Sequence, residues 1–532
     1  KCSESEDINM TWFHGKGKHG IWVALLITVM LTGCTWHGSG VNAITDKGEQ
    51  DQMKSDPALG LSIETPKMQP DILVDQNGYR TGAEKMVIFR GDGLPKQFEI
   101  RRVKDNAVVY TGSIKDRRYN QNFDEYDSYG YFTDFQTDGQ YYIQADVVGS
   151  SYAFTISDDV YQNIFSTACK QFYLNRCGIA LTEEYAGTHS HSVCHSSPAH
   201  LQENPSKEID VIGGWHLNEK SDRDVVTGCE VINNLLLAYE MNPDSFTDAS
   251  KIPESGNGIP DILDEVKYET DWLQKMQNPS SGGVYAAAVT SKTGNDNPSQ
   301  AEVTVEPEDD AATIAFAASM ARFSYIYQNY DKEYATKCLQ AADLAWQYYT
   351  SVEKASEHPQ AFAAAAELYR TTGDRKYEKI LTDFFREQTF IEQFKTDDSM
   401  FMGGITYLLT SQPVNVKTCS SIMKALLDKT ENIVDDANRD TYYISETDGV
   451  KTEQMLSDMR CLTVTNHVIY SHEYTAMIEN YAHYLMGRNP GAANLVDDTT
   501  EYTWRDSKET AGIISQPVAD AQLIILISAI DS

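Results

Sequence analysis

Cysteine and histidine side chains cluster in one stretch of the chain at positions that could hold a metal ion. They are Cys177, the adjacent pair Cys194 and His195, and His216. Four thiolate and imidazole ligands are the usual composition of a structural zinc site, which leaves no position for a reactive water. The spacing is not that of a common zinc finger, so two alternatives stay open: a disulfide between Cys177 and Cys194, or buried free thiols.

Acidic side chains supply the oxygen ligands that calcium prefers at two further places. Residues 261, 264 and 265 form one group, and residues 306 and 308–310 form the other. The first group lies at a predicted helix start, where the helix dipole favours acids without any metal. The second group is an ordinary acidic run. Calcium therefore remains an alternative cofactor with no ligand assigned.

The sequence around His216 resembles glycoside hydrolase family 9, the cellulase-type inverting enzymes. Residues 213–216 read Gly-Gly-Trp-His and residues 225–228 read Val-Val-Thr-Gly, which match the two flanks of the family signature Gly-Gly-Trp-His-Asp-Ala-Gly-Asp, four residues, Val-Val-Thr-Gly. Further blocks that resemble the family lie at residues 172–178, 255–265, 272–277, 282–285 and 484–490. The resemblance covers residues 70–530. It implies an (α/α)6 barrel, a β-1,4-glucan or related oligosaccharide as ligand, and zinc on the four residues named above.

The centre of the signature departs from the family at the positions that would carry catalysis. An inverting glycosidase uses one carboxylate to activate water and one carboxylic acid to protonate the leaving oxygen. By resemblance, Leu217 and Lys220 stand in place of two aspartates, the second being the base, and Ile514 stands in place of the acid glutamate. An ammonium group cannot accept a proton from water. The sequence therefore places no catalytic group at the family positions.

Three hypotheses about function follow from these replacements. In the first, Glu219, Asp222 or Asp224 supplies a substitute base from a shifted loop, and the protein is an inverting hydrolase. In the second, these acids are solvated loop charges, and the protein is a pseudoenzyme that binds glycans. In the third, it is a scaffold for a protein partner. Trp215, Tyr285 and Trp504 are candidates for stacking on sugar rings, with packing in the core as the alternative.

Composition and length restrict the partners and the number of domains. The 532-residue chain carries a net charge of −34, which argues against a nucleic-acid partner, because binding phosphates requires cations. A neutral polymer such as a glycan remains compatible. The length predicts two domains and a leader.

The N-terminal residues have the pattern of an export signal. Basic residues precede an apolar run at 21–31, too short to span a bilayer, and this run ends in Leu-Thr-Gly-Cys. That ending resembles a bacterial lipobox, which implies a lipid on Cys34 and attachment to the outer membrane or cell surface of a Gram-negative bacterium. An ordinary cleaved signal is the alternative. We expect residues 1–34 to be the signal region and residues 35–69 a flexible tether.

The rest of the chain divides into a β-rich part and a helical part. Short alternating runs separated by Gly, Asn and Asp turns predict an Ig-like β-sandwich over residues 70–158. From residue 159 to 532, helical periodicity dominates and suits the barrel. The predicted helices span residues 161–176, 226–240, 261–277, 311–330, 332–351, 360–372, 375–389, 418–429, 474–486 and 518–530.

Overall fold

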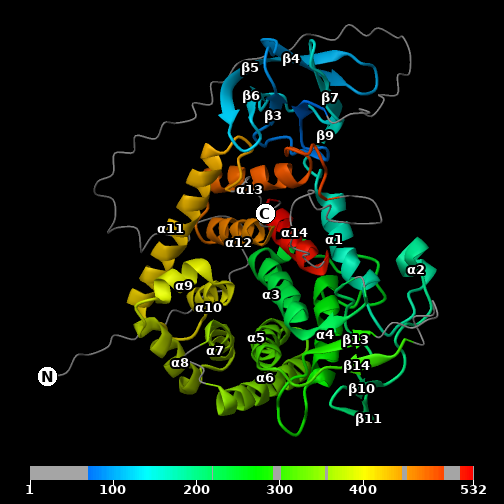
Figure 1. Ribbon diagram of the computed structural model, residues 1–532, viewed down its shortest axis with the longest axis vertical. Helices are drawn as coiled ribbons and strands as arrows, with labels where there is room; N and C mark the ends of the chain where they lie inside the picture. The colour runs from blue at the N-terminus through cyan, green and yellow to red at the C-terminus, as the bar shows by residue number, and fades with distance from the viewer. Residues whose placement is uncertain are drawn as a thin grey trace, which may run out of the picture.

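The structure is a computed structural model, and it describes residues 70–218, 220–290, 301–353, 358–445, 452–496 and 516–530. Two parts follow each other along the chain (Figure 1), a β-sandwich and a larger helical barrel. Both parts of the expected architecture are therefore present. The last strand of the sandwich ends at Ile156, and the first helix of the barrel begins at Gln162.

The sandwich consists of strands that pair in the order β1-β3-β6-β5-β4-β7-β9-β2, with β8 beside β7. Their bounds are β1 Ile72–Leu73, β2 Gly78–Tyr79, β3 Met86–Arg90, β4 Gln97–Arg102, β5 Val108–Asn120, β6 Glu125–Tyr131, β7 Gly139–Ala145, β8 Gly149–Ser150 and β9 Phe154–Ile156. The first half of β5 pairs with β4 and its second half with β6, so this long strand belongs to both sheets. All of the pairings are antiparallel except the parallel pair β2–β9.

Strand β3 shows how the sandwich is joined to the barrel. Its side chains alternate between two faces, as strand geometry requires. Val87 and Phe89 point into the sandwich core, whereas Met86 and Ile88 belong to the same apolar cluster as the barrel helices. One strand therefore contributes to both cores, and the two parts share a dry contact.

The barrel has an inner and an outer ring of helices, which Figure 1 shows around a common axis. The inner helices, each packed on ring neighbours, are α3 Val225–Met241, α5 Asp310–Tyr327, α7 Pro359–Thr372, α10 Asp398–Leu409, α12 Thr452–Val468 and α14 Gln516–Ile530. The outer helices are α1 Gln162–Leu174, α4 Asp261–Met276, α6 Lys332–Val352, α8 Arg375–Arg386, α11 Val416–Arg439 and α13 His472–Leu485. The short helices α2 Glu183–Ala186 and α9 Phe390–Thr396 lie between them in sequence.

Burial separates the two rings. In α8 the buried residues are Tyr377, Leu381 and Phe384, which form one stripe on an otherwise polar outer helix. In α14 every described side chain is buried, because the inner helix is surrounded by protein on all sides. An amphipathic stripe therefore characterises α8 in the outer ring, and burial on all sides characterises α14 in the inner ring.

A second sheet stands at one end of α3 and carries part of the site described below. Its strands pair in the order β11-β10-β14-β13-β12. They are β10 Ala199–Leu201, β11 Asn204–Ile209, β12 Arg223–Asp224, β13 Ala287–Thr290 and β14 Val303–Val305. Sequence analysis did not predict this sheet, since its strands are short and are separated by long loops.

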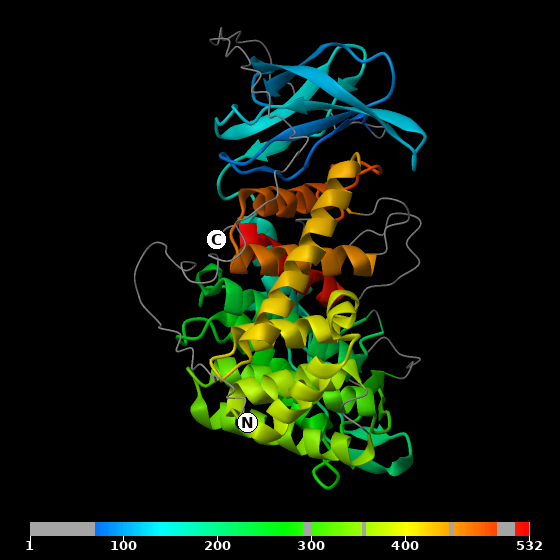
Figure 2. The same cartoon turned by 90° about the vertical axis from the view of Figure 1, so that its left-hand side faces the viewer.

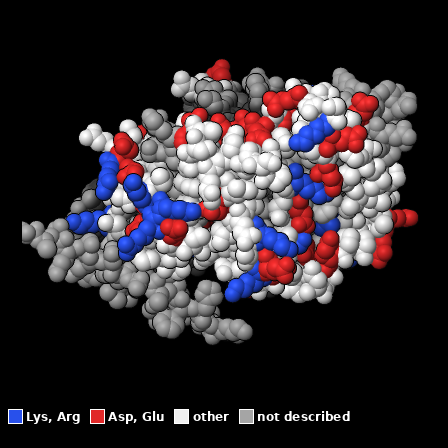
Figure 3. Space-filling model, turned by 90° about the horizontal axis from the view of Figure 1, so that it is seen from below, with Lys and Arg blue, Asp and Glu red and all other residues white. Residues whose placement is uncertain are grey.

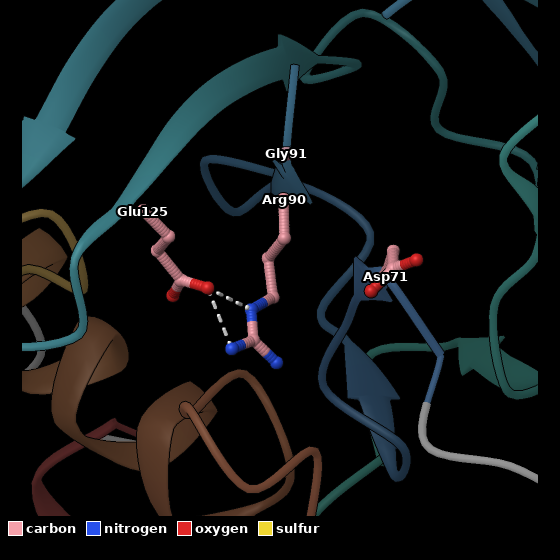
Figure 4. A pocket seen from close by; sticks show the side chains of 4 residues that line it. All are labelled: Asp71, Arg90, Gly91 and Glu125. Atoms are coloured by element: carbon pink, nitrogen blue, oxygen red, sulfur yellow. Dashed lines mark hydrogen bonds and ion pairs between the residues drawn. The ribbon is translucent and has the colours of Figure 1, made fainter.

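The sandwich lies next to α13 in Figure 2, and polar contacts join it to the turn that follows this helix. The Gln76 backbone N–H donates to the Met486 carbonyl at 2.7 Å, and Arg90 Nη1 donates to the Pro490 carbonyl at 3.1 Å. Arg90 also binds Glu125 Oε2 through Nε and Nη2, at 2.9 and 2.7 Å. Figure 4 shows these two side chains pointing toward each other beside a polar pocket of about 220 Å³. The joint therefore combines apolar contact with directional hydrogen bonds.

The surface charges and the lengths of the helices complete the description of the fold. On the face shown in Figure 3, acidic and basic side chains lie next to one another rather than in separate areas. Within the described ranges, every helix is too short or too polar to span a bilayer. The expected signal region, the tether and Cys34 lie outside the described residues.

Candidate functional site

The four cysteine and histidine residues named from the sequence come together at one point. Cys177 follows α1, Cys194 and His195 lie on the long loop after α2, and His216 lies just before the signature centre. One ligand atom from each lies within 4.8 Å of the others. Cys177, Cys194 and His195 are buried and His216 is half-buried, so the loop is held against the barrel.

The distances between these atoms fit the corners of a tetrahedron around zinc. Cys177 Sγ lies 3.9 Å from Cys194 Sγ and 3.5 Å from His195 Nδ1, and Cys194 Sγ lies 3.7 Å from His216 Nε2. Zinc bonds of about 2.3 Å to sulfur and about 2.0–2.1 Å to nitrogen imply edges of about 3.3–3.8 Å. The sulfur separation is too long for a disulfide, and both thiols are free, so the disulfide alternative is wrong for this structure.

Hydrogen bonding prepares one thiol for a metal. Contacts from Cys177, and then from His195 and His216, hold the pKa of Cys194 below its ordinary value. The Gly178 backbone N–H also donates to Cys194 Sγ, at 3.3 Å. A thiolate is the form of cysteine that binds zinc. The residues present therefore suit the ion in geometry and donor type, and Cys194 favours the form that binds it.

Thr290, at the end of β13, connects the metal group to the loop that follows His216. Its Oγ1 lies 3.3 Å from His195 Nε2 and donates to the Ser221 carbonyl at 3.1 Å. Its backbone N–H donates to Asp222 Oδ1 at 2.8 Å. Sequence analysis did not single out Thr290, because strand pairing alone brings it to this position.

Steric crowding explains why the second glycine of the signature, Gly214, has no side chain. Gly214 has a φ of 78°, and a Cβ on it would come within 2.7 Å of the Trp272 ring. Arg223 Nη1 donates to the carbonyls of Val211 and Gly213, at 2.6 and 2.9 Å, and so holds the same segment. The chain therefore crosses α4 at close range before it reaches Trp215.

Leu217 and Lys220 have opposite environments. Leu217 is 2% exposed and belongs to the barrel core, whereas Lys220 is exposed on the loop. Asn218 Oδ1 accepts the backbone N–H groups of Lys220 and Asp222, at 2.9 and 3.1 Å, and folds the loop into a tight turn. The side chain at position 217 is therefore part of the core, and the one at position 220 faces solvent.

Two of the three substitute acids are used by the loop itself. Asp222 receives the Thr290 N–H on Oδ1 and Asn218 Nδ2 on Oδ2, the latter at 3.1 Å. Asp224 caps α3, where its Oδ1 accepts the Thr227 backbone N–H at 2.7 Å. Glu219 lies outside the described residues. Both carboxylates therefore have architectural contacts, and their role as substitute bases stays an untested prediction.

A carboxyl that sequence analysis missed, that of Glu269 on α4, lies close to Leu217. A Cβ on Gly228 would come within 2.7 Å of Glu269 Oε1 and 3.8 Å of Leu217 Cδ1. Glu269 has no exposed surface, and burial raises the pKa of its carboxyl to about 8. The available signal was an acid at helical spacing from Glu265 and Leu273, on the apolar face of α4.

The aromatic residues proposed to stack on sugar are placed differently by the structure. Trp215 has no exposed surface and packs on Phe172, with ring centroids 5.1 Å apart. Tyr285 is 8% exposed. Both side chains are therefore largely covered by protein, and a role for either in binding sugar stays an untested prediction. Trp504 lies outside the described residues, as does Ile514.

The acids considered for calcium have protein partners. Asp261 Oδ2 accepts Ser255 Oγ at 2.9 Å, and Glu265 forms an ion pair with Arg176 at 3.0 Å. In the second group, Glu308 accepts from Asn278 and Ser281. Calcium binding stays an untested prediction.

Two family models match parts of this chain. Residues 161–502 match glycosyl hydrolase family 9, and residues 67–150 match the cellulase N-terminal Ig-like domain. The chain belongs to glycosyl hydrolase family 9. This confirms the resemblance inferred from the signature blocks.

One curated relative of this family 9 protein is Endoglucanase D of Acetivibrio thermocellus, 30% identical over 431 residues. The match covers 73% of this chain and 66% of that relative, so the chain spans somewhat less than two thirds of its length.

Solved structures show the same fold. A metagenome-derived family 9 endoglucanase is 22% identical, with a TM-score of 0.76 over 87% of this chain and 99% of its own. A zinc-binding triple mutant of another family 9 endoglucanase is also 22% identical, with a TM-score of 0.73 over 85% of this chain and 99% of its own. The (α/α)6 barrel and the Ig-like sandwich are thereby confirmed. The family 9 scaffold is therefore present in this chain.

Proposed function

We propose that this protein binds β-1,4-glucan-type polysaccharide and does not hydrolyse it by the family mechanism. The observation that carries the proposal is the loop after His216. Its described residues present Leu217 to the core, Lys220 to solvent and Asp222 to backbone and side-chain donors of the loop and β13. A base that activates water needs a carboxylate held against that water, and the hydrogen bonds of Asp222 hold its two oxygens on β13 and on the loop itself.

Family membership supports the choice of ligand. Residues 161–502 match the family, and solved family 9 endoglucanases share the fold, which supports a ligand of the same class. The names of the relatives, endoglucanases, point to the same class of polymer. Binding and catalysis use different groups, so the loss of the carboxylates can leave affinity for the polymer in place.

The test combines binding with product analysis on one preparation. We expect cellohexaose and mixed-linkage glucan to bind in calorimetry, while long incubation yields no shorter sugars. New sugars of inverted anomeric form that disappear in Glu219→Gln would contradict the proposal and favour the hydrolase hypothesis. Neither binding nor products would favour the scaffold hypothesis.

We further propose that Cys177, Cys194, His195 and His216 hold a structural zinc ion. The support is the fit of their distances to a zinc tetrahedron and the thiolate character of Cys194. When bound, the ion would fasten the loop after α2 to the barrel. Its fourth ligand position is filled by protein, so it would not activate water.

The location of the protein is a separate proposal. We propose a lipid on Cys34 that anchors the protein at the outer membrane or cell surface, on the support of the lipobox-like ending of the apolar run. Cells fed a labelled fatty acid should label the wild-type protein and not Cys34→Ser. Equal labelling of the two proteins would contradict the anchor.

A further inference from the structure

We infer that Thr290 is a positioning residue that couples the metal group to the conformation of the loop residues 217, 218 and 220–222. The inference rests on the proposed zinc site and goes beyond it, because it connects the ion to the altered signature centre. Thr290 lies on β13 and belongs neither to the metal group nor to the loop. It reaches the metal group with its hydroxyl and reaches the loop with both its hydroxyl and its backbone N–H.

The direction of each hydrogen bond follows from counting protons. A threonine hydroxyl has one proton, and here that proton is donated to the Ser221 carbonyl, 3.1 Å from Oγ1. The contact of 3.3 Å between Oγ1 and His195 Nε2 therefore requires the proton on the histidine nitrogen. Neutral imidazole carries one N–H, so Nδ1 is left with a lone pair. Thr290 thus selects one tautomer of His195.

That tautomer is the one suited to the metal group. His195 Nδ1 is the nitrogen that faces Cys177 Sγ, at 3.5 Å. A partner on the second ring nitrogen of a metal-binding histidine fixes the orientation of the ring and raises its affinity for the metal. The backbone of His195 has a φ of 42°, which non-glycine residues rarely adopt, so other contacts must hold the residue in place. The Thr290 hydroxyl is one such contact.

The loop side of the connection is equally specific. Ser221 has a φ of 62°, in the left-handed region, and its carbonyl accepts the Thr290 hydroxyl. The Thr290 N–H holds Asp222 Oδ1, and the Asp222 carbonyl in turn accepts the Leu217 N–H at 3.0 Å. The turn that presents Lys220 is thus closed through residues that Thr290 contacts directly.

The strand pairing explains why this position is occupied by the last residue of β13. Strand β12 pairs with β13 through Arg223–Ala288 and Asp224–Ala287. Thr290 lies two residues beyond Ala288, on the side of the pair where the loop enters β12. A valine there would keep the branched shape and lose the hydroxyl. The hydroxyl is therefore the feature to remove in a test.

The experiment compares wild-type protein with Thr290→Val, Thr290→Ser and the matched control Thr304→Val, which changes the same residue type on the adjacent strand β14. Zinc content and chelator competition report on the metal. The rate of trypsin cleavage after Lys220 reports on the loop. We expect Thr290→Val to bind zinc about 10–100-fold more weakly and to be cleaved faster at Lys220 even when saturated with zinc. Thr290→Ser and Thr304→Val should resemble wild type.

The possible results separate the two proposals. If wild-type protein binds no zinc, the metal site fails, and this inference fails with it. If wild-type protein binds zinc and Thr290→Val behaves as Thr304→Val does, only the coupling fails. Should Thr290→Val not fold, nitrogen-15 spectra of histidine in the wild-type zinc form decide the question. We expect the His195 proton on Nε2, and a proton on Nδ1 would overturn the inference.

Discussion

Glu269 holds the backbone of Trp215: its Oε2 accepts the Trp215 N–H at 2.7 Å, while its Oε1 has no hydrogen-bond partner among the described residues. Burial raises the pKa of this carboxyl to about 8, so at pH 7 it is mainly a neutral acid. A carboxyl group therefore lies near the signature centre, and its visible contact is to backbone.

The first prediction concerns pH. The pKa of Glu269 is about 8 in the folded protein against 4.5 ordinarily, so the folded state keeps a proton that the unfolded chain has lost between these values. This contribution to stability is fully present below pH 4.5 and disappears as the pH rises through 8. Glu269→Gln should make the stability of the protein less dependent on pH in this range. Thermal unfolding between pH 5 and pH 9 tests this, and an unchanged dependence would contradict it.

The second prediction concerns zinc. Purified protein should contain about one zinc per chain, and Cys194→Ser should lose it, since binding of the metal stabilises only the folded state. Cys419→Ser, which changes a free thiol on α11 away from the metal group, is the matched control. Metal analysis and the midpoint of thermal unfolding measure both effects. If wild-type protein contains no zinc and unfolds at the same midpoint with and without added zinc, the proposed zinc site is contradicted.

The third prediction concerns restoration of the family aspartates. In Leu217→Asp combined with Lys220→Asp, we expect little hydrolysis, because Ile514 still lacks a carboxyl. We also expect lower stability, because an aspartate at position 217 would enter the core near Glu269. Reducing-sugar assays and denaturant unfolding measure the two effects. Substantial cellulase activity in the double variant would show that the acid lies elsewhere.

The fourth prediction concerns the joint between sandwich and barrel. Asp75 is fully buried, receives the Asn77 and Gly78 backbone N–H groups, and lies 2.8 Å from His483 Nδ1. Burial raises the pKa of Asp75 and lowers that of His483, so both tend toward their neutral forms. Asp75→Ala leaves buried donors without a partner and should cost about 1–3 kcal/mol in denaturant unfolding.

Asp71→Ala serves as the control for this change, since Asp71 is exposed on the same part of the sandwich. Its free energy of unfolding should stay within about 0.5 kcal/mol of the wild-type value. Equal effects of the two substitutions would argue against a special role for the buried pair.

Periodicity in the sequence predicted the outer helices better than the inner ones. Helices α10 and α12 were missed, because both lie in the inner ring, where α10 has long apolar runs and a glycine pair rather than a polar face. A stripe of 3.6-residue period arises only where one face of a helix meets water. Helix α11 was predicted too short for the opposite reason, as its exposed polar residues extend well beyond the stripe that was recognised.

The sequence by itself determined the family, the two-part architecture and the four metal-binding candidates, and through the family resemblance it predicts the replacement of the family carboxylates. These depend on residue identity and on local order along the chain. Only the tertiary structure decided that Trp215 and Tyr285 are buried, that Asp222 and Asp224 are occupied by the loop, and that Glu269 and Thr290 adjoin the signature centre. The physical reason is that burial and hydrogen-bond partners are set by segments far apart in sequence, which helix and strand packing brings together.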